Sequence, residues 1–277
     1  MKEQIALEPI RRETCVVRET HKNSGRTISV KPGETASRNL FYGRIIIKAG
    51  DEPVEFQTAT HETGLICLNG TAKVATGDKE FSVTRYDAIY IPRDSTVTIT
   101  SSEGCDFAEL SSPVENQYPL QFVKFEDVRK DPSLHFIVTK PPTERDLNIL
   151  LGKNVEAGRI MAGVTFSSDG NWTSFPPHEH HDMLEEAYLY IDMPAPHWGI
   201  QMVYTAPDHP EFVSVVRDGD AVLMPAGYHP NVAAPGHSIN FIWMMAAHRE
   251  REDRLFGVVN VQPGFDQSGS GLEASRK

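Results

Sequence analysis

Short stretches in which apolar or β-branched residues alternate with polar ones dominate the chain, and helical periodicity is scarce. Turn formers such as Asn69-Gly70 and Gly77-Asp78 separate these stretches. Many short strands at close spacing are typical of an antiparallel sandwich or barrel. The strands predicted in the N-terminal half are Arg44–Lys48, Leu65–Leu68, Thr71–Ala75, Phe81–Thr84, Asp87–Ile91 and Thr96–Thr100, followed by a short helix or turn at Lys124–Lys130.

The C-terminal half continues the same pattern. Hairpin turns are predicted at Ser168–Asn171 and Arg217–Asp220, where turn-forming residues cluster. The predicted strands are Arg159–Phe166, Gln201–Tyr204, Phe212–Val216 and Ser238–Met245. The sequence therefore predicts an all-β protein in both halves.

One segment occurs twice, at equivalent places in the two halves. Asp87-Ala-Ile-Tyr-Ile-Pro92 recurs as Asp220-Ala-Val-Leu-Met-Pro225. An internal repeat of this kind indicates a duplicated unit. We predict an N-terminal β domain over residues 1–140 and a C-terminal one over 141–265, with a stiff linker within 131–143 and a disordered tail over 266–277.

Size and composition disfavour several classes of function. The 277 residues suffice for two domains with their own cores, and 39% hydrophobic with 23% charged residues is ordinary for a globular protein. A net charge of −11 without basic clusters disfavours nucleic acid as a partner. The chain shows no membrane-spanning run and no signal peptide, so we expect a cytoplasmic location. Its three cysteines are widely spread and predict buried free thiols.

The stretch around His178-Glu179-His180 carries the clearest chemical signal. On a strand, residues two apart project from the same face, so both imidazoles would enter one space. A carboxylate follows at Glu185 or Glu186, and His229 follows a stiff Pro-Ala-Gly turn. Three imidazoles and one carboxylate suit zinc, manganese, iron or nickel. The alternative is a chance pair on a wet surface, since the chain has eleven histidines.

The N-terminal half lacks this arrangement. His229 lies four residues after Pro225, whereas Thr96 lies four residues after Pro92. This half also has no His-X-His pair, although His61 is followed by Glu62. We therefore predict that only the C-terminal domain holds a metal ion.

Several separate segments together resemble one known family. They are Ser174–His180, Glu185–Tyr190, Val216–Pro230 and Ala233–Gly236. The match is to the bicupin isomerases of uronate-type sugars, the group of 5-deoxy-glucuronate isomerase and 5-keto-4-deoxyuronate isomerase. It is dense over about residues 159–245 and thin over the N-terminal half.

This resemblance implies two tandem double-stranded β-helix (jelly-roll) cupin barrels, with one divalent metal ion in the second barrel. The implied ligands are His178, His180, one glutamate and His229. We favour Glu186 as the glutamate, because it heads the Ala-Tyr-Leu-Tyr strand as in the relatives. Zinc is the first choice of metal, with manganese, iron or nickel as alternatives.

The sequence departs from the family at Glu179, where the inositol-pathway enzymes tend to carry lysine. Strand alternation directs Glu179 away from the metal, so ligation is expected to survive.

The activity implied is metal-dependent aldose–ketose isomerisation of a sugar acid, with 5-deoxy-D-glucuronate in myo-inositol breakdown as the first choice. Glu185 and Tyr228 are our candidates for the proton transfer between C2 and C1. His181 is a third option, although alternation directs it to the opposite strand face.

A carboxylate-bearing substrate also requires a cation. Arg159, Arg217 and Arg249 flank the predicted barrel, and each is more simply explained as a surface residue.

Alternatives remain at this stage. The same ligands permit an iron-dependent cupin dioxygenase, and a cupin that binds a sugar without turnover belongs to a different class. 5-Keto-4-deoxyuronate isomerase is the alternative within the family. Edge strands and a two-barrel body indicate a homo-oligomer.

Overall fold

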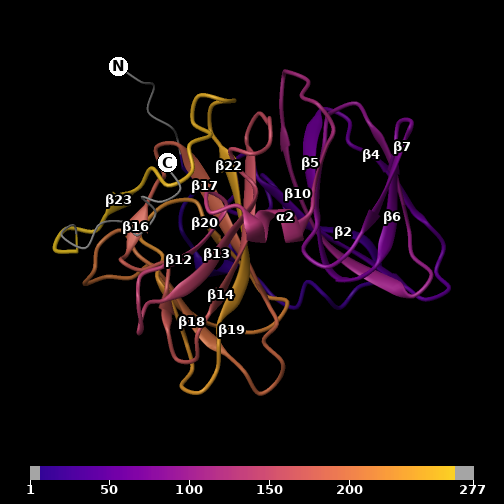
Figure 1. The fold of residues 1–277 in the computed structure, drawn as a ribbon. Coiled ribbons are helices and arrows are strands. Elements are labelled where there is room, and N and C mark those ends of the chain that lie inside the picture. Colours follow the sequence, from indigo (N-terminus) through magenta and orange to yellow (C-terminus); the bar gives the residue numbers. More distant parts are fainter. Residues whose placement is uncertain (1–6, 266–277) are drawn as a thin grey trace.

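A computed structural model describes residues 7–265, and the tail predicted over 266–277 lies outside the described residues. The chain forms two β barrels side by side, coloured indigo to purple and salmon to yellow in Figure 1. Two short helices, α1 (Arg12–Cys15) and α2 (Phe125–Lys130), are the only α-helices of the described residues. None of these helices could cross a membrane.

Each barrel consists of a large sheet and a four-stranded one. In the N-terminal barrel the large sheet has the order β11 (Gln121–Val123), β8 (Ala88–Ile91), β5 (His61–Gly70), β10 (Gly104–Pro113), β3 (Phe41–Lys48) and β2 (Gly25–Val30). The smaller sheet has the order β4 (Val54–Gln57), β9 (Thr96–Thr100), β6 (Ala72–Thr76) and β7 (Lys79–Val83).

The C-terminal barrel follows the same plan. Its large sheet has the order β1 (Val16–Val17), β20 (Ala221–Met224), β17 (Leu184–Ile191), β22 (Asn240–Ala247), β14 (Ile160–Ser167), β13 (Arg145–Leu151) and β12 (His135–Val138). The smaller sheet has the order β15 (Trp172–Thr173), β21 (Asn231–Ala233), β18 (Gly199–Val203) and β19 (Phe212–Val216). A two-stranded sheet joins β16 (His178–Glu179) to β23 (Asn260–Val261).

Burial explains why some strands alternate in sequence and others do not. Residues of β19 alternate between buried and exposed, because one face of its sheet contacts solvent. In β5, by contrast, Leu65 lies in the core of the N-terminal barrel and Ile66 lies in the larger core that also contains the C-terminal barrel. The large sheet is therefore covered on both faces, and its strands are apolar on both.

Strand order confirms the duplication. The series β8-β5-β10-β3 in the first barrel has the same order as β20-β17-β22-β14 in the second. The repeated six-residue segment forms β8 and β20, the corresponding strands. Thr63 pairs with Ile91 as Glu186 pairs with Met224, so Thr63 occupies the position of Glu186. The first barrel therefore has a hydroxyl where the second has a carboxylate.

Strand pairing does not follow the domain boundaries that we expected from the sequence. The segment predicted to be a linker contains β12, which pairs with β13 in the C-terminal sheet although it precedes residue 141. At the other end, β1 pairs with β20 of the C-terminal barrel. Nearby, Arg18 forms an ion pair with Asp220 at 2.6 Å. Val16 and Val17, which precede the whole N-terminal barrel in the sequence, are thus part of the second barrel's sheet, which the order of the sequence could not show.

Two buried glutamates join the barrels in a reciprocal way. Glu185 on β17 accepts hydrogen bonds from the backbone N–H groups of residues 38–40, at 2.7, 2.5 and 2.7 Å. Glu62 on β5, its equivalent in the repeat, accepts them from residues 158–160, at 2.7, 2.5 and 2.8 Å. Each carboxylate thereby satisfies three N–H groups at the start of a strand in the opposite half. We refer to this pair as the glutamate clamps.

The cysteines behave as expected. Cys15, Cys67 and Cys105 are free and buried. Burial raises the pKa of Cys15 to about 11 and that of Cys67 to about 12. Such thiols are inert packing residues at neutral pH.

Candidate metal centre

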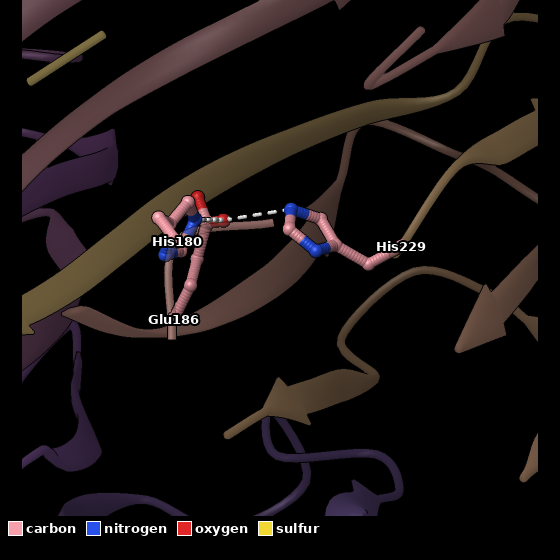
Figure 2. Close-up of side chains that lie close together, drawn as sticks. All are labelled: His180, Glu186 and His229. Atoms are coloured by element: carbon pink, nitrogen blue, oxygen red, sulfur yellow. Dashed lines mark hydrogen bonds and ion pairs between the residues drawn. The ribbon is translucent and has the colours of Figure 1, made fainter. Parts of the chain in front are cut away.

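Three of the four predicted ligands converge inside the C-terminal barrel. His180 follows β16, Glu186 lies on β17, and His229 follows β20 at the end of the Pro-Ala-Gly-Tyr turn. Figure 2 shows their side chains directed toward one another. Their ligand atoms all lie within 4.8 Å of one another, and all three residues are buried. We call these three residues the His/Glu group.

The glutamate carboxylate lies at the centre of this group. One of its oxygens, Oε2, is 3.0 Å from Nε2 of His180 and 3.1 Å from Nε2 of His229. His178 lies beside the group, with its ring centroid 5.1 Å from that of His229. The ring of His180 is 5.4 Å from that of His229. The structure therefore brings His178 next to the His/Glu group, although its nitrogens fall outside the 4.8 Å cluster.

Backbone carbonyls fix the tautomers of the imidazoles. Nδ1 of His178 lies 2.8 Å from the carbonyl oxygen of Pro176, and Nδ1 of His229 lies 2.9 Å from that of Gly227. Nδ1 of His180 lies 3.2 Å from the carbonyl oxygen of Leu184. A carbonyl only accepts, so each Nδ1 carries a proton and donates it. In a neutral imidazole this leaves Nε2 with a lone pair, as in metal-binding histidines.

Electrostatics in the group follows from its burial. Burial lowers the pKa of His178 to about 3, so this imidazole is neutral at physiological pH. Burial would raise the pKa of Glu186, but the adjacent imidazoles of His180 and His229 outweigh it and lower that pKa to about 2. The site therefore holds a carboxylate anion surrounded by imidazoles.

His229 provides the test of whether a cation fits. Its Nε2 is buried and has no hydrogen-bond partner within residues 7–265, although Oε2 of Glu186 is only 3.1 Å away. A neutral His229 imidazole with its proton on Nδ1 would direct the Nε2 lone pair at this carboxylate oxygen, and two acceptors at this distance repel each other unless a cation lies between them. A divalent cation bound to both atoms would remove the repulsion and satisfy the unpartnered nitrogen. The donor set therefore fits a metal ion.

Comparisons with known proteins identify the family of the chain. The model of the KduI/IolB family matches residues 15–258. The chain belongs to this family. A 5-deoxy-glucuronate isomerase of Geobacillus kaustophilus is 25% identical over 239 residues, which cover 80% of this chain and 84% of that protein. One of Bacillus licheniformis is 29% identical over 181 residues, covering 62% of this chain and 65% of that protein.

Solved structures show the same fold. An IolB-like protein from Salmonella typhimurium LT2 superposes with a TM-score of 0.80 at 20% identity, covering 91% of this chain and 98% of that one. Bacillus subtilis oxalate decarboxylase superposes with a TM-score of 0.62 at 13% identity, covering 83% and 76%. The predicted all-β bicupin fold is thereby confirmed.

The structure does not bring Glu185 to the site of this KduI/IolB-family chain. Glu185 and Glu186 are adjacent on β17, so their side chains leave opposite faces. The carboxylate of Glu185 belongs to a glutamate clamp, 1% exposed, with both oxygens occupied by backbone N–H groups. A carboxylate held in this way is a structural anchor and is not positioned for proton transfer at the His/Glu group.

The other candidates for proton transfer lie near the His/Glu group without joining it. Tyr228 precedes His229 and is partly buried against Tyr204, with ring centroids 5.6 Å apart. His181 contacts the carboxylate of Glu179, as expected from the alternation that turns both away from the metal. Glu179 also accepts a hydrogen bond from Asn260 at 2.6 Å. The part played by Tyr228 stays a prediction.

A cavity of about 40 Å³ adjoins the His/Glu group. It is lined by an arginine that was not among the candidate residues predicted from the sequence. Arg145, the first residue of β13, lines it together with His178 and Glu186. The three arginines considered from the sequence are engaged elsewhere or exposed: Arg159 donates to the carbonyl oxygens of Pro113 and Ala247, Arg249 pairs with Asp253, and Arg217 is exposed at a hairpin. None of those three lines the cavity among the described residues.

Proposed function

We propose that this protein is a metal-dependent aldose–ketose isomerase of a uronate-type sugar acid, and that it converts 5-deoxy-D-glucuronate to 5-deoxy-2-keto-gluconate. The observation that carries the proposal is the unpartnered Nε2 of His229 facing the carboxylate of Glu186 within a buried group of imidazoles. Further support comes from relatives named 5-deoxy-glucuronate isomerase, which match along most of their length.

The proposed metal ligands are His178, His180, Glu186 and His229. Each imidazole would bind through Nε2, because its Nδ1 donates to a backbone carbonyl. When bound, a divalent ion supplies Lewis acidity that polarises a carbonyl oxygen. Zinc suits three imidazoles and a carboxylate with open positions for substrate, and manganese, iron and nickel are the alternatives.

The chain's own residues would provide orientation and hydrogen bonds. The hydroxyl of Tyr188 lies 2.7 Å from that of Ser174, and both residues line the cavity. Tyr188 is also stacked on Phe241 with ring centroids 4.2 Å apart, which fixes its ring. A hydroxyl held in this way can donate to a substrate oxygen on which negative charge develops when C2 loses its proton. Tyr228 remains our candidate for carrying that proton to C1.

The direct test is to follow 5-deoxy-D-glucuronate by NMR with the zinc-loaded protein. We expect the aldehyde signals to be replaced by those of a 2-ketose. Removal of the metal with a chelator should slow the conversion by at least ~100-fold, the effect of losing a few kcal/mol of charge stabilisation. Restoring zinc should restore the rate.

Other outcomes would select the alternatives. Metal-loaded protein that leaves this substrate unchanged but converts 5-keto-4-deoxyuronate would move the substrate assignment to the sister activity. Oxygen consumption with iron would indicate a dioxygenase. Saturable sugar-acid binding with no product under any metal would indicate a binding protein and would contradict the proposal.

We also propose that the protein forms a homo-oligomer. Strand β19 lies at the edge of its sheet, and Val213 and Val215 on it are 47% and 39% exposed. An edge strand with exposed apolar side chains favours pairing with another chain. Light scattering should give a mass of at least twice 30.9 kDa, and a monomer at micromolar concentration would contradict this.

A further inference from the structure

The guanidinium of Arg145 is buried in the C-terminal barrel, and among the described residues no anion balances it. Arg145 is only 3% exposed. Its Nη1 donates to the carbonyl oxygens of Phe175, at 2.8 Å, and Thr143, at 3.4 Å, while Nη2 has no hydrogen-bond partner. Within residues 7–265 no carboxylate forms an ion pair with it. Burial lowers the pKa of Arg145 to about 10, so it remains charged at neutral pH.

A buried cation that lacks an anion is costly, and Arg44, the only other arginine in the buried class among the described residues, has an anion beside it. Arg44, which is 4% exposed, pairs with Asp106 through two hydrogen bonds of 2.6 Å. Unpaired buried charges are rare unless another partner binds them. Arg145 therefore lacks, within the described residues, the anionic partner that Arg44 has, and an anion bound from outside would supply it.

A second donor without a partner lines the same cavity. Nε1 of Trp243, on β22, is buried and finds no hydrogen-bond acceptor in the part of the chain that the structure describes. The indole is stacked on Phe256 with ring centroids 4.8 Å apart. It also covers Gly163 so closely that a Cβ there would lie 2.2 Å from the ring. The orientation of this donor is therefore fixed by packing, as is usual for binding sites on rigid elements.

The cavity is thus lined by two residues with an unpartnered buried donor, one of them charged, next to His178 and Glu186. Much of the remaining lining is apolar, from Leu147, Phe241, Met245 and Phe256. The volume of about 40 Å³ exceeds the ~10–15 Å³ needed for one water and admits a group of carboxylate size. An apolar group would leave both donors unsatisfied, and a cation would be repelled.

We propose that Arg145 and Trp243 form the subsite that binds the carboxylate of the sugar acid. A guanidinium binds a carboxylate through charge-assisted hydrogen bonds, and the indole N–H adds one neutral donor. The subsite sets specificity, because a neutral sugar would leave the arginine uncompensated. This inference rests on the proposed function for the identity of the acid, but the anion preference can be tested without turnover.

The test compares two ligands that cannot isomerise, D-gluconate and its neutral counterpart D-glucitol, by calorimetric titration of the zinc-loaded protein. We expect wild-type protein to prefer gluconate. Arg145→Met should weaken gluconate binding by about 10- to 100-fold, the effect of removing hydrogen bonds to a charged group, and should leave glucitol binding unchanged. Arg145→Lys should retain part of the preference, since lysine keeps the charge without the planar fork.

Two further variants complete the test. Trp243→Phe should weaken gluconate binding by about 3- to 10-fold while keeping the aromatic stacking. Arg217→Met, at an exposed arginine, is the matched control and should behave as wild type. Equal binding of gluconate and glucitol by wild type would overturn the inference. So would a preference that survives Arg145→Met in a protein whose zinc content and melting temperature match wild type.

Measuring isomerisation of 5-deoxy-D-glucuronate distinguishes a failure of this inference from a failure of the proposed function. If wild type does not isomerise 5-deoxy-D-glucuronate but its gluconate preference depends on Arg145, the proposed reaction fails and the anion subsite stands. If wild type isomerises that acid and Arg145→Met does so with unchanged KM, the reaction stands and the subsite is wrong. We expect the KM of Arg145→Met to rise at least 10-fold, with a smaller change in kcat.

Discussion

Replacing His229 with alanine is expected to abolish metal binding and isomerase activity while the protein stays folded. His229 contributes one of the nitrogens that face the carboxylate of Glu186, and its removal leaves an incomplete donor set. Loss of a residue that only orients a ligand typically lowers metal affinity 10- to 100-fold, so losing a ligand itself should cost at least ~100-fold. Zinc content after dialysis, measured by plasma emission spectroscopy, reports the change directly.

His181→Ala is the matched control for that variant. His181 is adjacent to the ligand His180 in sequence, but its ring contacts Glu179, away from the His/Glu group. We expect this variant to keep one zinc per chain. Full zinc occupancy in folded His229→Ala protein would remove His229 from the ligand set and would leave the catalytic proposal without its main support.

Replacing Glu185 with alanine should have the largest effect on stability. The substitution leaves three backbone N–H groups of residues 38–40 without their acceptor, and an unsatisfied buried donor costs about 1–3 kcal/mol. We therefore expect a loss of about 3 to 5 kcal/mol in the free energy of unfolding, measured by urea denaturation. The reciprocal variant Glu62→Ala should lose a similar amount, because Glu62 makes the equivalent contacts.

The milder variant Glu185→Gln distinguishes an anchor from a catalyst. A glutamine keeps one acceptor oxygen, so the protein should fold with reduced stability and retain most of its kcat at 25 °C. A fully stable Glu185→Gln protein with kcat lowered by orders of magnitude would contradict the structural role and restore our sequence-based assignment. Glu126→Ala, at an exposed residue paired with Lys130, serves as the control and should change stability by less than about 0.5 kcal/mol.

Much of the fold could be predicted because the strands are short and bounded by turns. Predicted strands such as Thr96–Thr100 and Phe212–Val216 coincide with β9 and β19. The central strand β10 was missed because its sequence includes Glu109, which looks exposed. In the structure this glutamate is 1% exposed and pairs with Arg26. A buried carboxylate that pairs with an arginine on a distant strand interrupts the hydrophobic pattern of a core strand.

Part of the site could also be predicted from the sequence. His180 and His229 follow from local spacing and a stiff turn, the family resemblance favoured Glu186 over Glu185, and the structure brings the three together. The role of Glu185 depends on backbone groups about 145 residues earlier in the chain, so its sequence neighbours could not show it. Arg145 was missed because it lies at the edge of a segment that looked like a linker. Only the folded barrel places its guanidinium in the cavity.

Anomalous X-ray diffraction at the zinc edge, from crystals of the zinc-loaded protein, tests the metal centre most directly. We predict one zinc peak per chain at about 2.0–2.2 Å from a carboxylate oxygen of Glu186 and from Nε2 of His178, His180 and His229. A peak outside bonding distance of His229, or no peak within the C-terminal barrel at saturating zinc, would contradict the account.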